Sequence, residues 1–340
     1  MPGEDKLIQH IARAIPSFSG VAGKLEGVEL GIGDDAMVIP GQGGEDWVVT
    51  VDAFAEGVHF LVDRHPPESV GYKSLARAAS DVAAMGAHPR FFLLTLGLPL
   101  TRSGLWLDRM LKGMAKAARA LGIRLVGGDT TQTANILMSL TVIGRIRHGQ
   151  AITRSGAKPG DLLYVSGRLG QAMLGLELVL NQHQRDRSLQ SLLKPHLYPR
   201  VRVELGAWLA SNRVASAMID ISDGLSTDLA RLCSASGVGA QIAAGKIPVV
   251  AVPMTLARRL KHVVDPIAMA LHGGEDYELL FSVPKRRVPK LRNAPGFNDL
   301  TEIGKVVPGK AVMLIDIDGG EHPLLPRGWD PFGRASRPKC

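Results

Sequence analysis

The sequence predicts an α/β (α+β) protein of two mixed domains, each a sheet with helices packed against it. The chain has 340 residues, which is about two domains at the usual ~100–200 residues each. Segments with strand character alternate with segments of helical periodicity along its length. Residues 153–161 are rich in Ser, Gly and Pro and interrupt this alternation near the middle. We therefore expect domains over residues 1–150 and 151–340.

The elements of the first domain follow from residue spacing. Residues 7–15 carry apolar side chains at helical intervals, and residues 47–54 are rich in β-branched side chains, which favours a strand. Residues 67–85 are rich in Ala, begin after a proline pair and stop before Gly86, as a helix does. The remaining expected elements are a strand over 91–98, a helix over 104–121, and strands over 123–126 and 136–146.

The second domain is predicted in the same way. Ser222 or Asp223 is well placed to cap the N-terminus of the helix expected there, because both side chains offer an oxygen to its free amides. The expected elements are strands over 162–165, 215–221 and 279–283, and helices over 171–180, 201–211 and 223–235.

Composition narrows the class of protein. Hydrophobic residues make up 45% and charged residues 21%, which is typical of a globular chain with a core. The net charge is +8, but the basic residues are scattered, and the densest run, Lys285–Arg287, lacks the interleaved aromatics of a nucleic-acid groove. With two cysteines, no signal peptide and no run of ~18 apolar residues, we expect no disulfide framework, no zinc site and a cytoplasmic location.

Two segments partly resemble nucleotide-binding motifs but do not match them. Residues 31–39, GIGDDAMVI, contain Gly31, Gly33 and Ala36 at the spacing of a dinucleotide fingerprint. A strand is expected after them instead of a helix, and the two aspartates would repel a bare pyrophosphate. Residues 20–25, GVAGKL, lack the spacing of a P-loop.

Acidic residues recur beside Gly, Ser or Thr along the chain. Any one such cluster is most simply a turn. Asp81 differs, because it lies near the C-terminal end of the helix expected over 67–85, where the helix dipole disfavours an anion, and because its Ala-rich surroundings predict partial burial. An Arg77–Asp81 ion pair is the structural explanation of Asp81, and a bound cation is the functional one. The clusters are Asp34-Asp35, Thr50-Val51-Asp52, Ser80-Asp81, Gly127 to Thr131, Asp220 to Gly224, and Gly273 to Asp276.

A hard divalent cation explains the clusters together. Convergent carboxylates raise one another's pKa unless a positive charge lies between them. Oxygen ligands without Cys or His pairs favour Mg²⁺, which commonly binds together with phosphates. Aspartates can then face phosphate groups when metal ions separate them. A helix N-terminus after Asp220 would favour a phosphate as well.

Seven segments in order carry a resemblance that covers residues 31–329. They are GIGDDAMVI, VDAFAEGVHF, SDVAAMGAHP, LVGGDTTQT, ITRSGAKPGDLLYVSG, IDISDGLSTDL and GGEDYELLF. Together they resemble the thiamine-monophosphate kinase family, of the superfamily of aminoimidazole-ribonucleotide synthetase. The resemblance implies two domains, a homodimer through the N-terminal sheet, and phosphorylation of thiamine monophosphate to thiamine diphosphate by ATP, with several Mg²⁺ ions and by direct in-line transfer.

The resemblance also implies residue roles, with no catalytic acid or base. A packed histidine at His59 and an apolar anchor at Trp329 stay open as alternatives, and Val51 could offer a metal only its carbonyl. The implied metal ligands are Asp35, Thr50, Asp52, Asp81, Asp129, Asp220 and Asp223; the implied ATP contacts are Gly128, Asp129, Arg154 and Ser222; and the implied acceptor contacts are His59, Glu275 and Trp329.

Two other functions stay open. Hydrogenase-maturation proteins of the same superfamily use a C-terminal cysteine, and this chain ends in Cys340. A nucleotide sensor or nucleic-acid-binding module would also fit a basic chain with acidic clusters. Dependence of ATP turnover on thiamine monophosphate separates the kinase from a sensor, and a steep loss of affinity with salt would indicate nucleic-acid binding.

Overall fold

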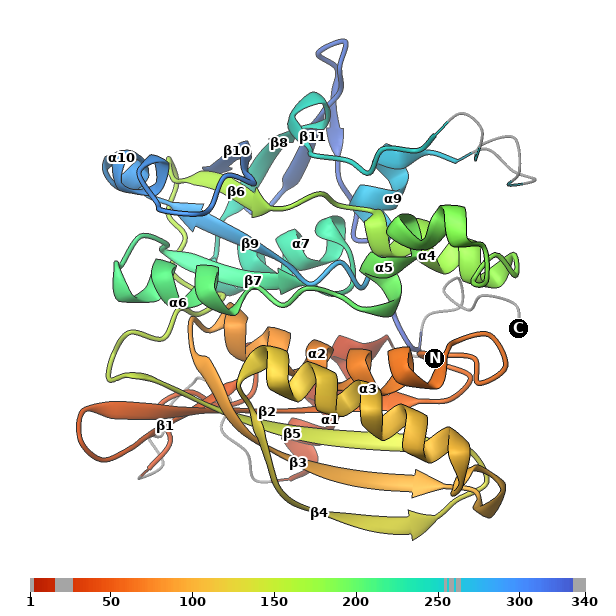
Figure 1. Cartoon of the computed structure of the whole chain (residues 1–340). Coiled ribbons are helices and arrows are strands. Elements are labelled where there is room, and N and C mark those ends of the chain that lie inside the picture. The colour runs from red at the N-terminus through yellow and green to blue at the C-terminus, as the bar shows by residue number, and fades with distance from the viewer. Residues whose placement is uncertain (1–2, 16–26, 254–255, 257–259, 261–263, 333–340) are drawn as a thin grey trace. The chain divides into compact units, whose positions relative to one another are not determined.

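A computed structural model of the chain describes residues 3–15, 27–253, 256, 260 and 264–332 (Figure 1). The chain divides into two compact units. Unit 1 comprises the described residues of Met1–Ala151, Val201–Ser211 and Asp330–Cys340, and unit 2 those of Ile152–Arg200 and Asn212–Trp329. None of the helices in the described ranges has the length and apolar character of a membrane-spanning segment.

Unit 1 is a five-stranded sheet with helices on one face, in the order β1-β2-β5-β3-β4. Neighbouring strands are antiparallel except β3 and β4, which run parallel. Its elements are α1 (Glu4–Ala14), β1 (Met37–Pro40), β2 (Glu45–Ala55), α2 (Pro67–Ala84), β3 (His88–Leu98), the 3₁₀ turn η1 (Leu100–Arg102), α3 (Leu105–Leu121), β4 (Arg124–Gln132), β5 (Leu137–Arg147) and α6 (Val203–Ser211).

Glycines let the helices of unit 1 approach one another at backbone distance. A Cβ at Gly113 of α3 would lie 1.8 Å from the carbonyl oxygen of Glu68 in α2, and a Cβ at Gly71 would lie 1.9 Å from that of Met110. Gly206 of α6 meets α2 in the same way, 2.1 Å from the oxygen of Ala83. The helix layer that covers the sheet therefore depends on the absence of side chains at these crossings.

The two faces of this sheet differ in burial. Along β2, successive side chains alternate between faces, so Thr50, Asp52 and Phe54 point to the side covered by α2, whereas Val51 on the other face is 66% exposed. Every residue of β4, the strand at the edge, is exposed. The polar residues expected to act as ligands on β2 thus lie on the helix-covered face.

Unit 2 is a seven-stranded sheet in the order β12-β11-β8-β10-β6-β9-β7, and α7 packs on it over the main apolar core. Its strands are β6 (Leu162–Ser166), β7 (Ala217–Ile221), β8 (Gly239–Ala243), β9 (Glu278–Val283), β10 (Leu300–Val307), β11 (Val312–Ile315) and β12 (Glu321–Pro323). Its helices are α4 (Gln171–Leu180), α5 (Gln190–Leu197), α7 (Leu225–Ser236), α9 (Pro266–His272) and α10 (Val288–Arg292), with 3₁₀ turns η2 (Arg187–Leu189), η3 (Ala244–Lys246) and η4 (Lys285–Arg287).

The mixed α/β class and every element predicted from the sequence are confirmed, most within two residues at each end. The strand predicted over 123–126 was too short, because β4 continues through the glycine and threonine cluster to Gln132. The strand after Gly33 is confirmed as β1, which excludes a dinucleotide fingerprint. Sequence reasoning missed β1 as a hairpin partner of β2, four strands of unit 2, and the short helices α5, α9 and α10.

Candidate functional site

Two elements of unit 1 bring predicted ligands together. Thr50 of β2 donates a hydrogen bond through Oγ1 to Asp81 Oδ2 of α2, at 2.8 Å. Asp35 lies in the bend before β1, after a turn at Gly33 whose φ of 121° favours glycine. Carboxylate oxygens of Asp35 and Asp81 lie within 4.8 Å of one another. Three of the ligands predicted for unit 1, Asp35, Thr50 and Asp81, are therefore neighbours in space.

This arrangement fits a divalent cation. Asp35 is 8% exposed and Asp81 is half-buried near the C-terminal end of α2, where the helix dipole adds further negative potential. Two carboxylates so close in a partly buried place repel each other unless a cation lies beside them. Their oxygens and the Thr50 hydroxyl are the hard donors that Mg²⁺ prefers. The partial burial predicted for Asp81 is confirmed.

Asp52, the next predicted ligand on β2, holds an arginine. Arg77 of α2 donates through Nε to Asp52 Oδ2 at 2.6 Å. The Arg77 guanidinium also lies over the Phe54 ring, 5.5 Å from its centroid. The sequence suggests Asp81 as a partner of Arg77, and this pair stays a prediction; the contact with Asp52 was not predicted.

Gly128 and Asp129 lie apart from these ligands. The ladder pairs Asp52 with Leu140, Leu140 with Leu94, and Leu94 with Gly128, so Gly128 is three strands from Asp52. At the usual strand spacing this is about 14 Å. Asp129 is exposed, and its carboxylate accepts a hydrogen bond from the Thr130 amide at 2.8 Å. Within one chain, the structure joins Asp129 to none of the other unit 1 ligands by a hydrogen bond or ion pair among the described residues.

Only glycine fits at Gly128. Its φ is 154°, and a Cβ there would lie 1.9 Å from the Leu94 carbonyl oxygen. The neighbouring Gly127 has no such restriction, since its Cβ would meet only a Leu93 methyl group at 3.5 Å. The close approach of β3 to β4 therefore explains one glycine of the pair.

In unit 2, the predicted ligands lie where β7 ends and α7 begins. Asp220, the fourth residue of β7, is 2% exposed. The N-cap residue of α7 is Gly224, whose φ is 112° and which has no side chain to cap the helix. The predicted cap at Ser222 or Asp223 was therefore wrong, because the helix is capped from within: Asp228 Oδ2 accepts from the Asp223 amide at 3.1 Å and the Gly224 amide at 3.0 Å.

Asp223 and Asp228 share one cation. The Arg231 guanidinium contacts the carboxylates of both residues. Burial, and then the adjacent Asp223 carboxylate, raises the pKa of Asp228 well above its usual range. As at Asp52, a predicted ligand is held by an arginine, here one that lies about two turns into the following helix.

The segment Gly273 to Tyr277 lies against the same turn. Glu275 donates its amide to the Ser222 carbonyl at 2.7 Å, and both Glu275 (φ 70°) and Tyr277 (φ 50°) adopt left-handed backbone. His196 Nδ1, on a side chain 1% exposed, lies 3.2 Å from Glu275 Oε2. Such strain in non-glycine residues is found where surrounding structure enforces it, commonly at functional sites.

The neighbouring Asp276 ties this segment to α4. Its carboxylate accepts hydrogen bonds from the amides of Gly170 at 2.6 Å and Ala172 at 2.9 Å. Burial raises the pKa of Asp276 to about 7, although these bonds oppose the shift. The segment that carries Glu275 is thereby held to the start of α4.

Trp329 and Arg154 also lie in unit 2. The Trp329 amide donates to the Asp223 carbonyl at 2.9 Å, so this predicted acceptor contact lies beside the turn that bears the predicted metal ligand. Arg154 lies before β6, and its backbone carbonyl accepts a hydrogen bond from Ser236 Oγ at 3.0 Å. Unit 2 therefore groups Ser222, Asp223 and Trp329 with Glu275.

His59 of unit 1 has the packed arrangement left open from the sequence. Its Nδ1 accepts a hydrogen bond from the Ala55 amide at 3.0 Å, and its ring stacks on Phe54 with centroids 5.4 Å apart. Its role as an acceptor contact stays a prediction. Cys340, the residue on which the hydrogenase-maturation alternative depends, lies outside the described residues.

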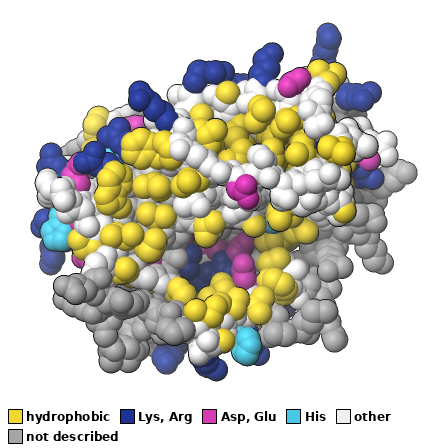
Figure 2. Space-filling view, turned by 90° about the horizontal axis from the view of Figure 1, so that it is seen from below, with side chains coloured by type: hydrophobic (Ala, Val, Ile, Leu, Met, Phe, Trp, Pro, Cys, Tyr) yellow, Lys and Arg dark blue, Asp and Glu magenta, His cyan; other side chains and the backbone are white. Residues whose placement is uncertain are grey.

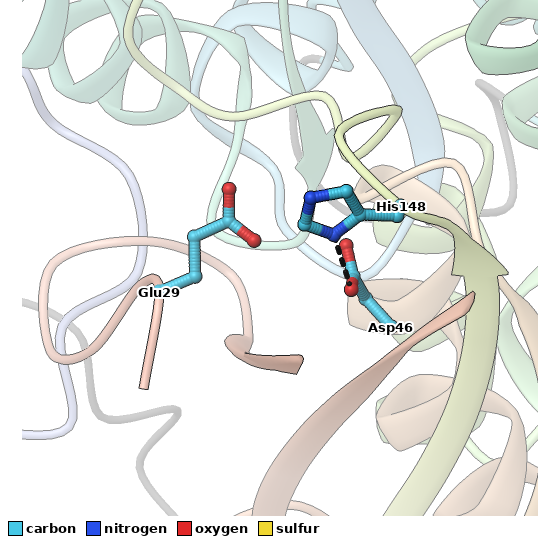
Figure 3. A group of neighbouring side chains, drawn as sticks. All are labelled: Glu29, Asp46 and His148. Carbon is cyan, nitrogen blue, oxygen red and sulfur yellow. Dashed lines mark hydrogen bonds and ion pairs between the residues drawn. The ribbon is translucent and has the colours of Figure 1, made fainter. Parts of the chain in front are cut away.

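A histidine and two carboxylates form a further group that sequence reasoning missed (Figure 3). His148, just after β5, places Nδ1 2.9 Å from Asp46 Oδ1 of β2, and the Gly149 amide donates to Asp46 Oδ2 at 3.1 Å. Asp46 is 1% exposed, whereas Glu29 is exposed and turns its carboxylate toward the imidazole. The hydrogen bond to Asp46 raises the pKa of His148. The group closes the end of the β2–β5 pair, and no local pattern predicts it because 102 residues separate its partners.

Comparison with known proteins identifies the family. Residues 33–146 match the family described as AIR synthase related protein, N-terminal domain, and residues 158–317 match AIR synthase related protein, C-terminal domain. The thiamine-monophosphate kinase of Bacillus subtilis (strain 168) is 35% identical over 312 residues, which are 90% of this chain and 94% of that protein. The thiamine-monophosphate kinase of Escherichia coli (strain K12) is 36% identical over 312 residues, 90% of this chain and 92% of that protein.

Comparison with solved structures supports the same family. The structure of AaThiL complexed with AMPPCP and TMP has a TM-score of 0.82 and 33% identity, covering 97% of each chain. A HypE–HypF complex has a TM-score of 0.71 at 20% identity, which shows a shared fold alone. The chain belongs to the thiamine-monophosphate kinase family, within the AIR synthase related proteins.

Proposed function

We propose that this protein transfers the γ-phosphoryl group of ATP to thiamine monophosphate and so forms thiamine diphosphate. The observation that carries the proposal is the match over 97% of the chain to a structure complexed with AMPPCP, an ATP analogue, and TMP. The relatives named thiamine-monophosphate kinase, at 35–36% identity over 90% of the chain, support it.

Several Mg²⁺ ions are part of the proposal. We assign Asp35, Thr50 and Asp81 to a divalent cation, supported by the proximity of the two carboxylates and by their hard oxygen donors. We assign Asp52, Asp129, Asp220 and Asp223 to further ions on the family resemblance. When bound, the ions would neutralise the negative charge of the transferring phosphoryl group.

The residues then act by position and not by proton transfer. A phosphate oxygen of thiamine monophosphate is ionised at neutral pH and attacks the γ-phosphorus in line, so no general base is required. We assign ATP contacts to Gly128, Asp129, Arg154 and Ser222, and acceptor contacts to His59, Glu275 and Trp329. The grouping of Glu275, Ser222 and Trp329 in unit 2 supports part of this assignment.

A homodimer through the sheet of unit 1 belongs to the same proposal. Val51 of β2 and Leu137 of β5 lie on the face opposite the helices and are 66% and 45% exposed. On the edge strand β4, Leu125 and Val126 are 57% and 56% exposed. Figure 2, seen from below Figure 1, shows apolar side chains in broad patches on the surface. The exposed edge strand β4 adds unpaired backbone groups. Exposed apolar surface of this kind is typical of an interface, and sedimentation velocity would test the oligomeric state directly.

We also propose a cytoplasmic location. It is supported by the absence of paired cysteines in the sequence and by Cys233, a buried thiol whose pKa burial raises to about 12, which makes it inert.

The test is product formation. Protein, Mg·ATP and thiamine monophosphate are mixed, and thiamine diphosphate is measured by oxidation to its fluorescent thiochrome after chromatography. We expect ATP consumption to depend on thiamine monophosphate, and Asp81→Asn to reduce turnover at least a hundredfold. Asp63→Asn, at an 87% exposed side chain of the same unit, is the matched control and should keep turnover. ATP hydrolysis independent of thiamine monophosphate, with no diphosphate formed, would refute the proposal.

A further inference from the structure

We propose that Arg77 is a built-in cation for Asp52, and that it restricts divalent-ion binding at this carboxylate. A metal ion reaches Asp52 only when the guanidinium leaves it. The inference rests on the proposed function in one respect, that Asp52 belongs to the metal site. It adds a residue of this chain that sets how readily that site fills.

The Arg77–Asp52 ion pair is short and partly buried. Arg77 Nε and Asp52 Oδ2 are 2.6 Å apart, which is short for a charge-assisted hydrogen bond. The two side chains are 16% and 21% exposed, so water screens the pair less than it screens a surface ion pair. Asp52 points to the helix-covered face of the sheet because it alternates with Val51 along β2. The ion pair therefore joins α2 directly to the strand that carries the predicted ligands.

The Phe54 ring holds the Arg77 guanidinium in place. The Arg77 carbon Cζ lies 5.5 Å from the centroid of Phe54, within the range of a cation–π contact. Phe54 itself is 1% exposed and stacks on Phe60, with centroids 5.1 Å apart, so it cannot turn away. A planar guanidinium can stack on the ring and bond the carboxylate at once, which a lysine ammonium cannot do.

The charge balance of the two parts of the site differs as a result. Asp35 and Asp81 face each other as two carboxylates with a hydroxyl donor, which leaves a divalent ion attracted to them. At Asp52 one negative charge already faces one positive charge. A divalent ion there would lose the attraction of a neutralised carboxylate and meet the repulsion of the guanidinium. Asp35 and Asp81 should therefore fill with metal before Asp52 does.

Binding of Mn²⁺, followed by electron paramagnetic resonance without nucleotide, tests this directly. Wild type, Arg77→Ala, Asp52→Asn and the double variant form a cycle. We expect Arg77→Ala to bind one more Mn²⁺ per chain or to bind Mn²⁺ about tenfold more tightly, within the range of coupling between contacting charges. We expect Asp52→Asn to bind as wild type does at the first ion, and the double variant to show no gain over Asp52→Asn.

Two further variants control the cycle. Arg109→Ala removes an arginine paired with Glu68 at 2.8 Å on the neighbouring helix, and it should leave Mn²⁺ binding unchanged. Arg77→Met keeps a long apolar side chain against Phe54 without the charge, so it should reproduce the gain of Arg77→Ala with the fold intact. Circular dichroism melting of each variant establishes folding.

Unchanged or weaker Mn²⁺ binding in both folded Arg77 variants would overturn the inference, as would a gain that persists in the double variant. The two proposals fail separately. Thiamine diphosphate formed by wild type, with no gain in Arg77→Met, would reject the role of Arg77 alone. A gain in Mn²⁺ binding without any diphosphate formation would keep the role of Arg77 and reject the kinase activity.

Discussion

Asp81→Asn should stabilise the metal-free protein while removing its response to metal. The two carboxylates lie within 4.8 Å, and at an effective dielectric constant of about 20 their repulsion is roughly 332/(20 × 4.8), or about 3.5 kcal/mol. Asp81 is half-buried and Arg77 lies one turn away, so solvent and the guanidinium reduce this figure. We expect a net gain of about 1–2 kcal/mol, because an Asn oxygen can still accept the Thr50 hydroxyl.

The assay is thermal unfolding in EDTA and in Mg²⁺. For a unit of this size, about 1–2 kcal/mol corresponds to a rise of about 3–6 °C in Tm. In EDTA the variant should melt higher than wild type; adding Mg²⁺ should raise wild type and leave the variant nearly unchanged, because ligand binding stabilises only the state that binds. Asp63→Asn should follow wild type in both buffers. A variant that melts below wild type in EDTA, or that gains as much from Mg²⁺, would refute the reasoning.

Three other predictions follow from contacts in unit 1. Gly128→Ala should disrupt the β3–β4 pairing and abolish ATP binding measured by calorimetry, whereas Gly127→Ala should bind ATP as wild type does; equal affinities would contradict the close approach at Gly128. Gly113→Ala forces a Cβ to 1.8 Å from a carbonyl of α2 and should cost about 3 kcal/mol or more, seen as a large fall in Tm; a shift under 2 °C would be inconsistent with the helix crossing. Because Asp46 raises the pKa of His148, the stabilisation from their pair is complete below the unfolded histidine pKa and is lost as pH rises through the folded value. Wild type should therefore lose stability relative to His148→Gln over that interval, and identical pH profiles of Tm would count against the pair.

Features set by neighbouring residues, such as helix bounds, could be predicted from residue spacing in the sequence. The Ala-rich helix over 67–85, bounded by a proline pair and a glycine, corresponds to α2 with its end one residue earlier. The helix dipole singled out Asp81 as an unusual position for an acid, and the structure places it half-buried near the C-terminal end of α2. The missed strands of unit 2 are short or carry polar and glycine residues, so their pairing partners and not their own sequence define them.

The partners of the acidic residues could not be predicted. Arg77 is four residues before Asp81 on one helix, which suggests a pair between them, but that spacing says nothing of the contact with Asp52 that packing of α2 on β2 creates. Asp228 caps its own helix from the first turn, which displaced the expected cap at Ser222 or Asp223. The Arg77 contact depends on how α2 packs on β2, which no short spacing in the sequence encodes. The Asp228 contact is local, but it competes with the cap expected at Ser222 or Asp223, and the sequence alone does not decide between them.

Anomalous diffraction from crystals soaked in Mn²⁺ most directly tests the claim that acids of unit 1 gather around a divalent cation. We predict a strong peak coordinated by Asp35 and Asp81, close to the Thr50 hydroxyl, and retained at low Mn²⁺ concentration. Mn²⁺ bound elsewhere in the crystal, with no peak between these two carboxylates, would contradict the account.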